Sequence, residues 1–108
     1  MTVPHELIVI FCTVPDDETA ERLAKGLVES RLAACVKVIS GVRSFYRWEG
    51  KIEVGSEVQM LIKTQRSRFE AIEEWIHEQH PYDVPELVAL SACDVAEPYA
   101  KWAVEQTQ

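Results

Sequence analysis

Two successive stretches with a two-residue periodicity constrain the fold of this chain more than any other feature. From Ala34 to Trp48, and again from Ile52 to Thr64, most even-numbered positions are apolar, and charged or polar residues alternate with them in the second stretch. Alternation with this period is typical of β-strands. Glu49-Gly50 lies between the two stretches and is a turn signal. The sequence therefore predicts one long β-hairpin.

The parity of the apolar positions predicts how the two strands of the hairpin pair. Both strands have their apolar residues on even numbers, so a shared apolar face requires opposed residues whose numbers add to an even total. A three-residue loop, Glu49–Lys51, satisfies this condition and pairs Trp48 with Ile52. A two-residue loop would oppose apolar to polar residues unless a β-bulge at Gly41 or Gly55 intervened. We favour the three-residue loop and keep the bulge as the alternative.

Helical spacing of apolar residues predicts three helices, and two short apolar runs predict two more strands. Asp16 precedes the first helical stretch and is a good N-cap residue, while Ser67 and Glu70 form a capping-box pattern before the second. His80-Pro81 ends the second helix, because the residue before a proline disfavours helical geometry. Pro98 lies near the start of the third. In chain order these elements are a strand at 7–14, a helix at 16–31, a helix at 67–80, a strand at 87–93 and a helix at 97–106.

The order of elements predicts the fold class. Strand, helix, two strands, helix and strand, followed by a terminal helix, make a βαββαβ pattern. Right-handed crossovers fold such a chain into an α+β, ferredoxin-like sandwich, in which two helices cover one face of an antiparallel sheet. The 108 residues correspond to a single domain, 1–108.

The length of the hairpin predicts an oligomer. Each arm has about 14 residues and spans roughly 45 Å at about 3.3 Å per residue, whereas a compact domain of this size is roughly 35 Å across. The hairpin must therefore bend or project beyond its own helices. A projecting ribbon that exposes Tyr46, Trp48, Ile52 and Val54 would promote aggregation unless a partner covered it.

Composition excludes several classes of protein. The net charge of -7 argues against general binding of nucleic acid, which needs a basic surface. No apolar run is long enough to span a bilayer, and the N-terminus does not resemble a signal peptide. Cys12, Cys35 and Cys93 are far apart and form no C-x-x-C pair, which favours a reducing compartment, the cytoplasm. Catalytic motifs such as H-E-x-x-H or a glycine-rich phosphate loop are missing, which argues against an enzyme.

Several separate motifs follow one another along the chain: Cys12–Pro15, Glu29–Val36, Tyr46–Lys51, Glu57–Thr64, His80–Glu86 and Tyr99–Trp102. Together and in this order they resemble the CutA family of divalent-cation tolerance proteins, and the resemblance extends from about Ile8 to Trp102. It implies a ferredoxin-like fold related to the PII signalling proteins and a tight homotrimer whose hairpins exchange contacts between subunits.

The resemblance also implies a copper site. In this family copper binding is attributed to a cysteine of the first strand and to a pair of histidines before Pro-Tyr; these positions are Cys12, Gln79 and His80 here. Gln79 departs from the pattern, and an amide is a poor copper ligand beside imidazole or thiolate. His77 lies three residues before His80 on the same predicted helix and is a candidate replacement.

Each candidate ligand also has a purely structural interpretation. A free cysteine in an apolar strand, such as Cys12, is usually an inert small hydrophobic residue, and the same interpretation applies to Cys35 and Cys93. His80 would equally well close its helix, since an imidazolium is favoured at a helix C-terminus.

Aromatic and charged residues from separate motifs predict a cleft between subunits where the hairpin meets the Pro-Tyr loop. Sites at such interfaces commonly bind small ligands. The alternative is an aromatic seam of the trimer in which Lys63 and Glu86 form an ion pair. The predicted cleft residues are Tyr46, Trp48, Lys63, Tyr82, Glu86 and Trp102.

Taken together, the sequence predicts a non-enzymatic, cytoplasmic homotrimer that serves divalent-cation tolerance and binds copper, or a similar divalent cation, through Cys12 and His80. One alternative is a PII-like sensor that binds a small molecule between subunits and signals to an unidentified partner protein. A structural scaffold is another. No nucleic acid or membrane partner is expected. A trimer would carry a charge of about -21, which attracts cations in general.

Overall fold

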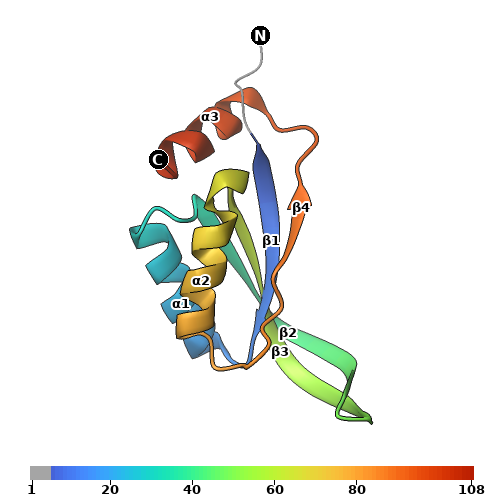
Figure 1. Cartoon of the computed structure of the whole chain (residues 1–108). Helices are drawn as coiled ribbons and strands as arrows, with labels where there is room; N and C mark the ends of the chain where they lie inside the picture. The colour runs from blue at the N-terminus through green and yellow to red at the C-terminus, as the bar shows by residue number, and fades with distance from the viewer. Residues whose placement is uncertain (1–5) are drawn as a thin grey trace.

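The computed structural model describes residues 6–108 and confirms the predicted order of elements (Figure 1). A short 3-10 turn, Arg66–Arg68, precedes the second helix. The elements are β1 (Leu7–Val14), α1 (Asp17–Glu29), β2 (Cys35–Trp48), β3 (Lys51–Gln65), α2 (Phe69–Gln79), β4 (Val88–Ser91) and α3 (Glu97–Gln106).

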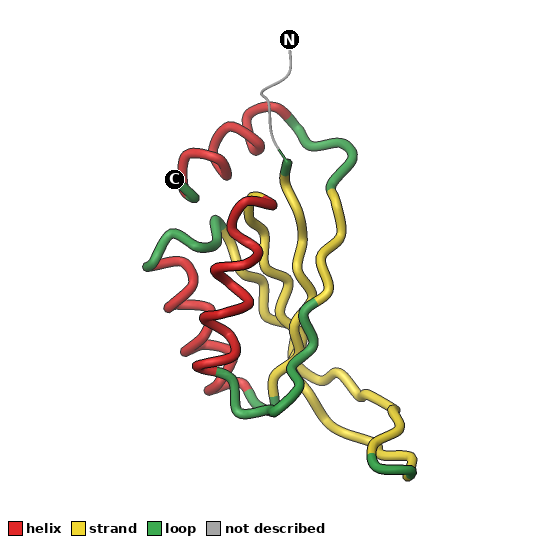
Figure 2. Tube along the Cα trace, viewed as in Figure 1, coloured by secondary structure: helices red, strands yellow, loops and turns green. Residues whose placement is uncertain are grey.

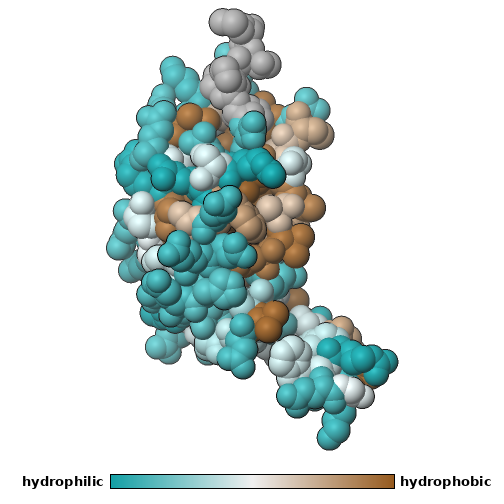
Figure 3. All heavy atoms as spheres, in the orientation of Figure 1, coloured by the Kyte–Doolittle hydropathy of each residue, from teal (hydrophilic) through white to brown (hydrophobic). Residues whose placement is uncertain are grey.

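The four strands form one antiparallel sheet in the order β2-β3-β1-β4, which is the ferredoxin-like arrangement that the sequence predicts. Helices α1 and α2 cover the same face of the sheet (Figure 1). Among residues 6–108, no helix covers the middle of the other face (Figure 1). On that face, Val88 and Leu90 of β4 are 51% and 53% exposed. Hydrophobic residues gather over the β4 side of the molecule, whereas the surface over α1 and α2 is mainly hydrophilic (Figure 3).

The core lies between the sheet and the two helices. The even-numbered residues of β1, from Ile8 to Val14, are buried in this core, and Leu23 and Leu27 of α1 are fully buried opposite them. Ile72 and Ile76 of α2 complete this layer. The helical and strand periodicities in the sequence therefore point at the same core, as a ferredoxin-like sandwich requires.

The register of the hairpin differs from the one we favoured and matches the alternative. Glu49 and Gly50 form a two-residue turn with positive φ at both positions, so Trp48 pairs with Lys51. Positive φ at both central residues is the turn geometry that fits the twist of a hairpin. The register then shifts between Ile39 and Val42, at a bulge that contains Gly41 with φ +79°.

The bulge is the physical reason for the difference. On the helix side of the bulge, Val38 opposes Met60 and the apolar faces match, as expected. Beyond it, Phe45 opposes Val54 and Tyr46 opposes Glu53. The apolar residues of the outer hairpin therefore divide between both faces. No single apolar face is required there, because no helix of residues 6–108 covers that segment (Figure 1).

The outer hairpin projects from the rest of the protein, as its length predicts. The molecule measures 51 × 25 × 23 Å along its principal axes. The hairpin tip and α3 lie at opposite ends of it (Figure 1). Phe45, Ile52 and Val54 on the outer hairpin are 60% or more exposed.

Two local predictions are wrong. The Ser67–Glu70 capping box does not form, because Ser67 lies within the 3-10 turn, and α2 begins at Phe69 without a side-chain cap. Cys93 lies beyond the end of β4 and is exposed rather than part of a strand. The Asp16 N-cap is confirmed, since its Oδ1 accepts a hydrogen bond of 2.7 Å from the Thr19 N–H.

Candidate functional site

A pocket of about 590 Å³ lies where the hairpin leaves the sheet. One wall is the loop after α2, residues 81–86, which passes the base of the hairpin before it reaches β4 (Figure 2). The other side is formed by Ser44, Tyr46 and Trp48 of β2 and by Glu57 of β3, and Thr13 at the end of β1 also lines it. A volume of this size is typical of sites for small organic molecules.

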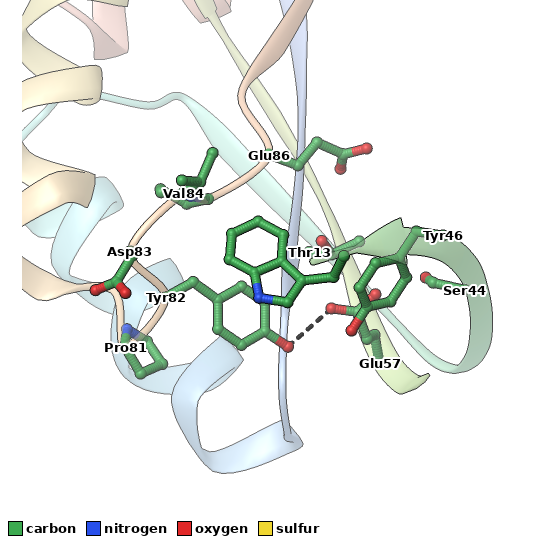
Figure 4. A pocket seen from close by; sticks show the side chains of 11 residues that line it. Thr13, Ser44, Tyr46, Glu57, Pro81, Tyr82, Asp83, Val84 and Glu86 are labelled. Atoms are coloured by element: carbon green, nitrogen blue, oxygen red, sulfur yellow. Dashed lines mark hydrogen bonds between the residues drawn. The ribbon is translucent and has the colours of Figure 1, made fainter. Parts of the chain in front are cut away.

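A hydrogen bond between Tyr82 and Glu57 joins the two sides of the pocket. The Tyr82 hydroxyl donates to Glu57 Oε2 at 2.8 Å (Figure 4). Glu57 is only 9% exposed, although the alternation along β3 places it on the polar side of that strand. Burial, and then the hydrogen bond to Glu57, raise the pKa of Tyr82 well above its usual value, so its hydroxyl remains a donor at neutral pH.

The bulge in β2 brings two of the three aromatic rings of the hairpin, Tyr46 and Trp48, to this pocket. On β3, alternate residues place Glu57 on the same face as Gln59, and Ile39 opposes Gln59 before the bulge. Without the shift, the odd-numbered residues of the outer β2 would share that face. Because one residue is added, Tyr46 and Trp48 line the pocket instead. Ser40 in the bulge donates a hydrogen bond to Asp17 at the start of α1, which ties this part of the hairpin to the helical layer.

His80 holds the pocket loop against β1. It is 7% exposed, its Nε2 lies 2.8 Å from the carbonyl oxygen of Thr13, and its Nδ1 accepts a hydrogen bond of 3.0 Å from the Tyr82 N–H. A carbonyl only accepts, so this network assigns the neutral ring with its proton on Nε2. Burial lowers the pKa of His80, in keeping with that neutral form. The ring is therefore not an imidazolium at the C-terminus of α2, although the His80 N–H does bond Ile76 O there.

Cys12 lies in the core next to the same carbonyl group. It is fully buried, and its Sγ is 3.9 Å from Thr13 O. Burial, with the charge of Glu86 as a smaller contribution, raises the pKa of the Cys12 thiol to about 12. A thiol with this pKa is protonated at neutral pH and is a weak nucleophile and metal ligand.

Gln79, which replaces the family's first histidine, has a structural contact. Arg22 of α1 donates to Gln79 Oε1 at 3.3 Å and to its backbone oxygen at 3.1 Å, so the two helices are tied together at the C-terminus of α2. His77, the suggested replacement, is exposed on α2.

The donor types of Cys12 and His80 suit Cu(I), but the arrangement seen here offers no free ring nitrogen and no thiolate. Within residues 6–108, no group of three or more His, Cys, Asp or Glu side chains is placed to hold a metal ion. The role of Cys12 and His80 as copper ligands stays a prediction.

The structure brings four of the six predicted cleft residues together: Tyr46, Trp48, Tyr82 and Glu86 line the pocket. The other two lie in a different cluster, near α3. Lys63 Nζ is 5.4 Å from the centre of the Tyr99 ring, and Tyr99 and Trp102 have ring centres 5.5 Å apart.

Within the chain, Glu86 accepts a hydrogen bond of 3.4 Å from Gln59 Nε2. The ion pair between Lys63 and Glu86 at a seam between subunits stays a prediction. Sequence reasoning missed Glu57, Thr13 and Asp83 as pocket residues. The signal that could have found Glu57 is Gly41, because a bulge there puts Tyr46 and Trp48 on the same face of the hairpin as Glu57.

Comparison with known proteins assigns the family. The family model "CutA1 divalent ion tolerance protein" matches residues 8–106. A divalent-cation tolerance protein CutA from Pectobacterium atrosepticum is 50% identical over 97 residues, which cover 90% of this chain and 88% of that protein. "Protein CutA, chloroplastic" from Arabidopsis thaliana is 40% identical, and the match covers 99% of this chain but 58% of that protein.

A solved structure gives the same result for the fold. The crystal structure of CutA1 from Oryza sativa superposes with a TM-score of 0.94 at 38% identity, covering 96% of this chain and 95% of that one. The names of the family model and of the Pectobacterium protein refer to tolerance of divalent cations. No helix in residues 6–108 has the length and hydrophobicity needed to cross a membrane. The chain belongs to the CutA1 family of divalent ion tolerance proteins.

Proposed function

We propose that this protein serves divalent-cation tolerance as a homotrimer that binds a small molecule in the pocket between the hairpin and the 81–86 loop, in the manner of a PII-like sensor and without catalysing a reaction. The observation that carries the proposal is the pocket itself. It has a suitable volume, aromatic walls, and a buried carboxylate held by the Tyr82 hydroxyl.

Exposed apolar surface at two places supports assembly with further copies of the chain. Phe45, Ile52 and Val54 are exposed on the outer hairpin, and Val88 and Leu90 are exposed on the edge strand β4. Both a projecting ribbon and an apolar edge strand promote aggregation unless they are covered. Light scattering should give three times the mass of the chain; a stable monomer would contradict the proposal.

Paired tryptophan variants test the pocket. A screen of metabolites by thermal shift should find a compound that stabilises the wild type, because a ligand at 100 times its Kd adds about 2.7 kcal/mol. Trp48→Ala should abolish this shift, whereas Trp102→Ala, a similarly exposed tryptophan in the other cluster, should keep it. The trimer mass of both variants is measured alongside. If the hits stabilise Trp48→Ala as much as the wild type, the pocket is not the site.

Direct copper binding at Cys12 and His80 is a second candidate, favoured by one specific contact. Both side chains lie against the same oxygen, that of Thr13, so thiol and imidazole are neighbours. Binding would require His80 to give up its bond to Thr13 and Cys12 to lose its proton.

A Cu(I) competition titration tests this candidate with three variants. Cys12→Ala and His80→Ala should each weaken binding at least tenfold, while Cys93→Ala, which removes an exposed thiol, should leave it unchanged. Equal binding by the wild type, Cys12→Ala and His80→Ala would exclude the site.

We also propose that the protein works in the cytoplasm. A further protein would bind it and receive the signal that ligand binding generates. The three cysteines are free, as a reducing compartment would keep them. The net charge of -7 supports neither nucleic acid nor an anionic membrane as that partner. Cell fractionation with a tagged chain tests the compartment, and recovery in a periplasmic or organellar fraction would contradict it.

A further inference from the structure

We propose that the pocket takes an organic cation: an amine, ammonium or guanidinium group carried on a molecule of several heavy atoms. This inference rests on the proposed function, that the pocket binds a small molecule, and names the chemical class of that molecule.

The first argument is the charge of the pocket lining. Glu57, Asp83 and Glu86 line it, and no Lys, Arg or His side chain does so among residues 6–108. Glu57 is the most buried of the three, and its hydrogen-bond partner is the Tyr82 hydroxyl, which is a neutral donor. The carboxylate is therefore held in place while its formal charge is left uncompensated. A largely buried charge of this kind favours an opposite charge beside it.

The second argument is the aromatic lining. Tyr46, Trp48 and Tyr82 all line the pocket. The carboxylate of Glu57 lies between the rings of Tyr82 and Tyr46, whereas Asp83 and Glu86 lie farther out (Figure 4). Aromatic rings attract cations placed over their faces within about 6 Å, and more strongly where water is excluded. Rings and carboxylate together make a surface that favours a cation and disfavours an anion.

The third argument separates an organic cation from a bare metal ion. A hard metal ion needs several oxygen ligands converging on one point. The three carboxylates of the pocket do not converge, since no group of three His, Cys, Asp or Glu in the described chain is placed to hold a metal. The cavity of about 590 Å³ also exceeds what a single ion fills. The positive charge must therefore be carried on a larger body that contacts the rings.

Three probes of similar size and different charge test the inference: benzylamine, benzyl alcohol and benzoate. Titration calorimetry on the intact oligomer at pH 7 should show benzylamine binding at least tenfold more tightly than benzyl alcohol, with benzoate weakest. Glu57→Gln should remove this preference, because its amide oxygen still accepts from Tyr82 but the charge is gone. Glu70→Gln, on the exposed surface of α2, makes the same change in net charge and should keep the preference.

The outcomes distinguish this inference from the proposed function. If benzyl alcohol or benzoate binds as well as benzylamine, or if none of the three binds, the cationic class is wrong even where a metabolite still binds the pocket. If both glutamine variants weaken benzylamine equally, the general charge of the protein attracts it rather than Glu57. The proposed function fails separately, when Trp48→Ala leaves every stabilising ligand unaffected.

Discussion

Replacing His80 by alanine should destabilise the protein substantially, because one buried ring satisfies two backbone groups. The ring donates to Thr13 O and accepts from the Tyr82 N–H. Each hydrogen bond contributes about 1 kcal/mol net, and a partner left unsatisfied in a dry site costs about 1–3 kcal/mol. The pocket loop can admit some water, so we expect a loss of about 2–4 kcal/mol.

Urea unfolding at pH 7.5 measures this loss. The chain concentration is kept fixed, because the stability of the proposed trimer would depend on it. The matched control is His77→Ala on the same helix. His77 is exposed, so its replacement should change the free energy of unfolding by no more than about 0.5 kcal/mol. If His80→Ala also costs less than about 0.5 kcal/mol, the two hydrogen bonds do not hold the loop and the reasoning is refuted.

The pH dependence provides a second readout from the same residue. Burial lowers the pKa of His80 in the folded protein; the Thr13 bond and the charge of Glu57 oppose this, and Arg22 and His77 add to it. As pH falls through about 6.5, the unfolded chain therefore binds a proton before the folded one does, and stability decreases. His80→Ala should lose this part of the pH dependence and His77→Ala should keep it. Identical slopes in all three proteins would contradict the assignment.

Three further predictions concern single residues. Mass spectrometry after treatment with iodoacetamide at pH 8 should find Cys93 labelled in the native protein and Cys12 labelled only after unfolding, because burial raises the pKa of Cys12 to about 12. Rapid labelling of Cys12 in the native protein would contradict its burial. Gly41→Ala should cost about 1 kcal/mol in urea unfolding because φ is +79°, although its Cβ has room; no loss would mean that the bulge relaxes. Gly26→Ala should lower the free energy of unfolding despite the better helix propensity of alanine, because its Cβ would lie 2.6 Å from the Trp75 ring. In a Trp75→Leu background the same change should stabilise the protein by roughly 1 kcal/mol, and the same sign in both backgrounds would refute the clash.

Periodicity predicted α1 and α2 well, because each helix buries one face and its apolar residues recur at helical spacing. A continuous apolar run predicted β1, which lies inside the sheet between β3 and β4. The reasoning from periodicity failed for the outer hairpin. It assumed one shared apolar face, which holds where helices cover the sheet and not where the ribbon leaves them. Parity alone did not choose between a longer loop and a bulge at Gly41.

The site was predictable in part for a similar reason. Tyr46, Trp48 and Tyr82 are unusual residues in recognisable motifs, and they do share a pocket. Glu57 occupies an ordinary polar position of an alternating strand, and its burial comes from a loop that is 25 residues away in sequence at Tyr82. Contacts of that range depend on how the loop folds back, which local spacing does not encode.

The extra residue in β2 also sets the direction in which the ribbon leaves the sheet. The bulge at Gly41 places two residues of β2 opposite one residue of β3. Deleting Gly41 would therefore remove the bulge without changing any pair beyond it, and Tyr46 and Trp48 would keep their place on the pocket wall. The deletion would instead remove the local bend and the added twist that a bulge gives to its strand. The hairpin tip would then point elsewhere while the side chains that face the pocket stayed the same.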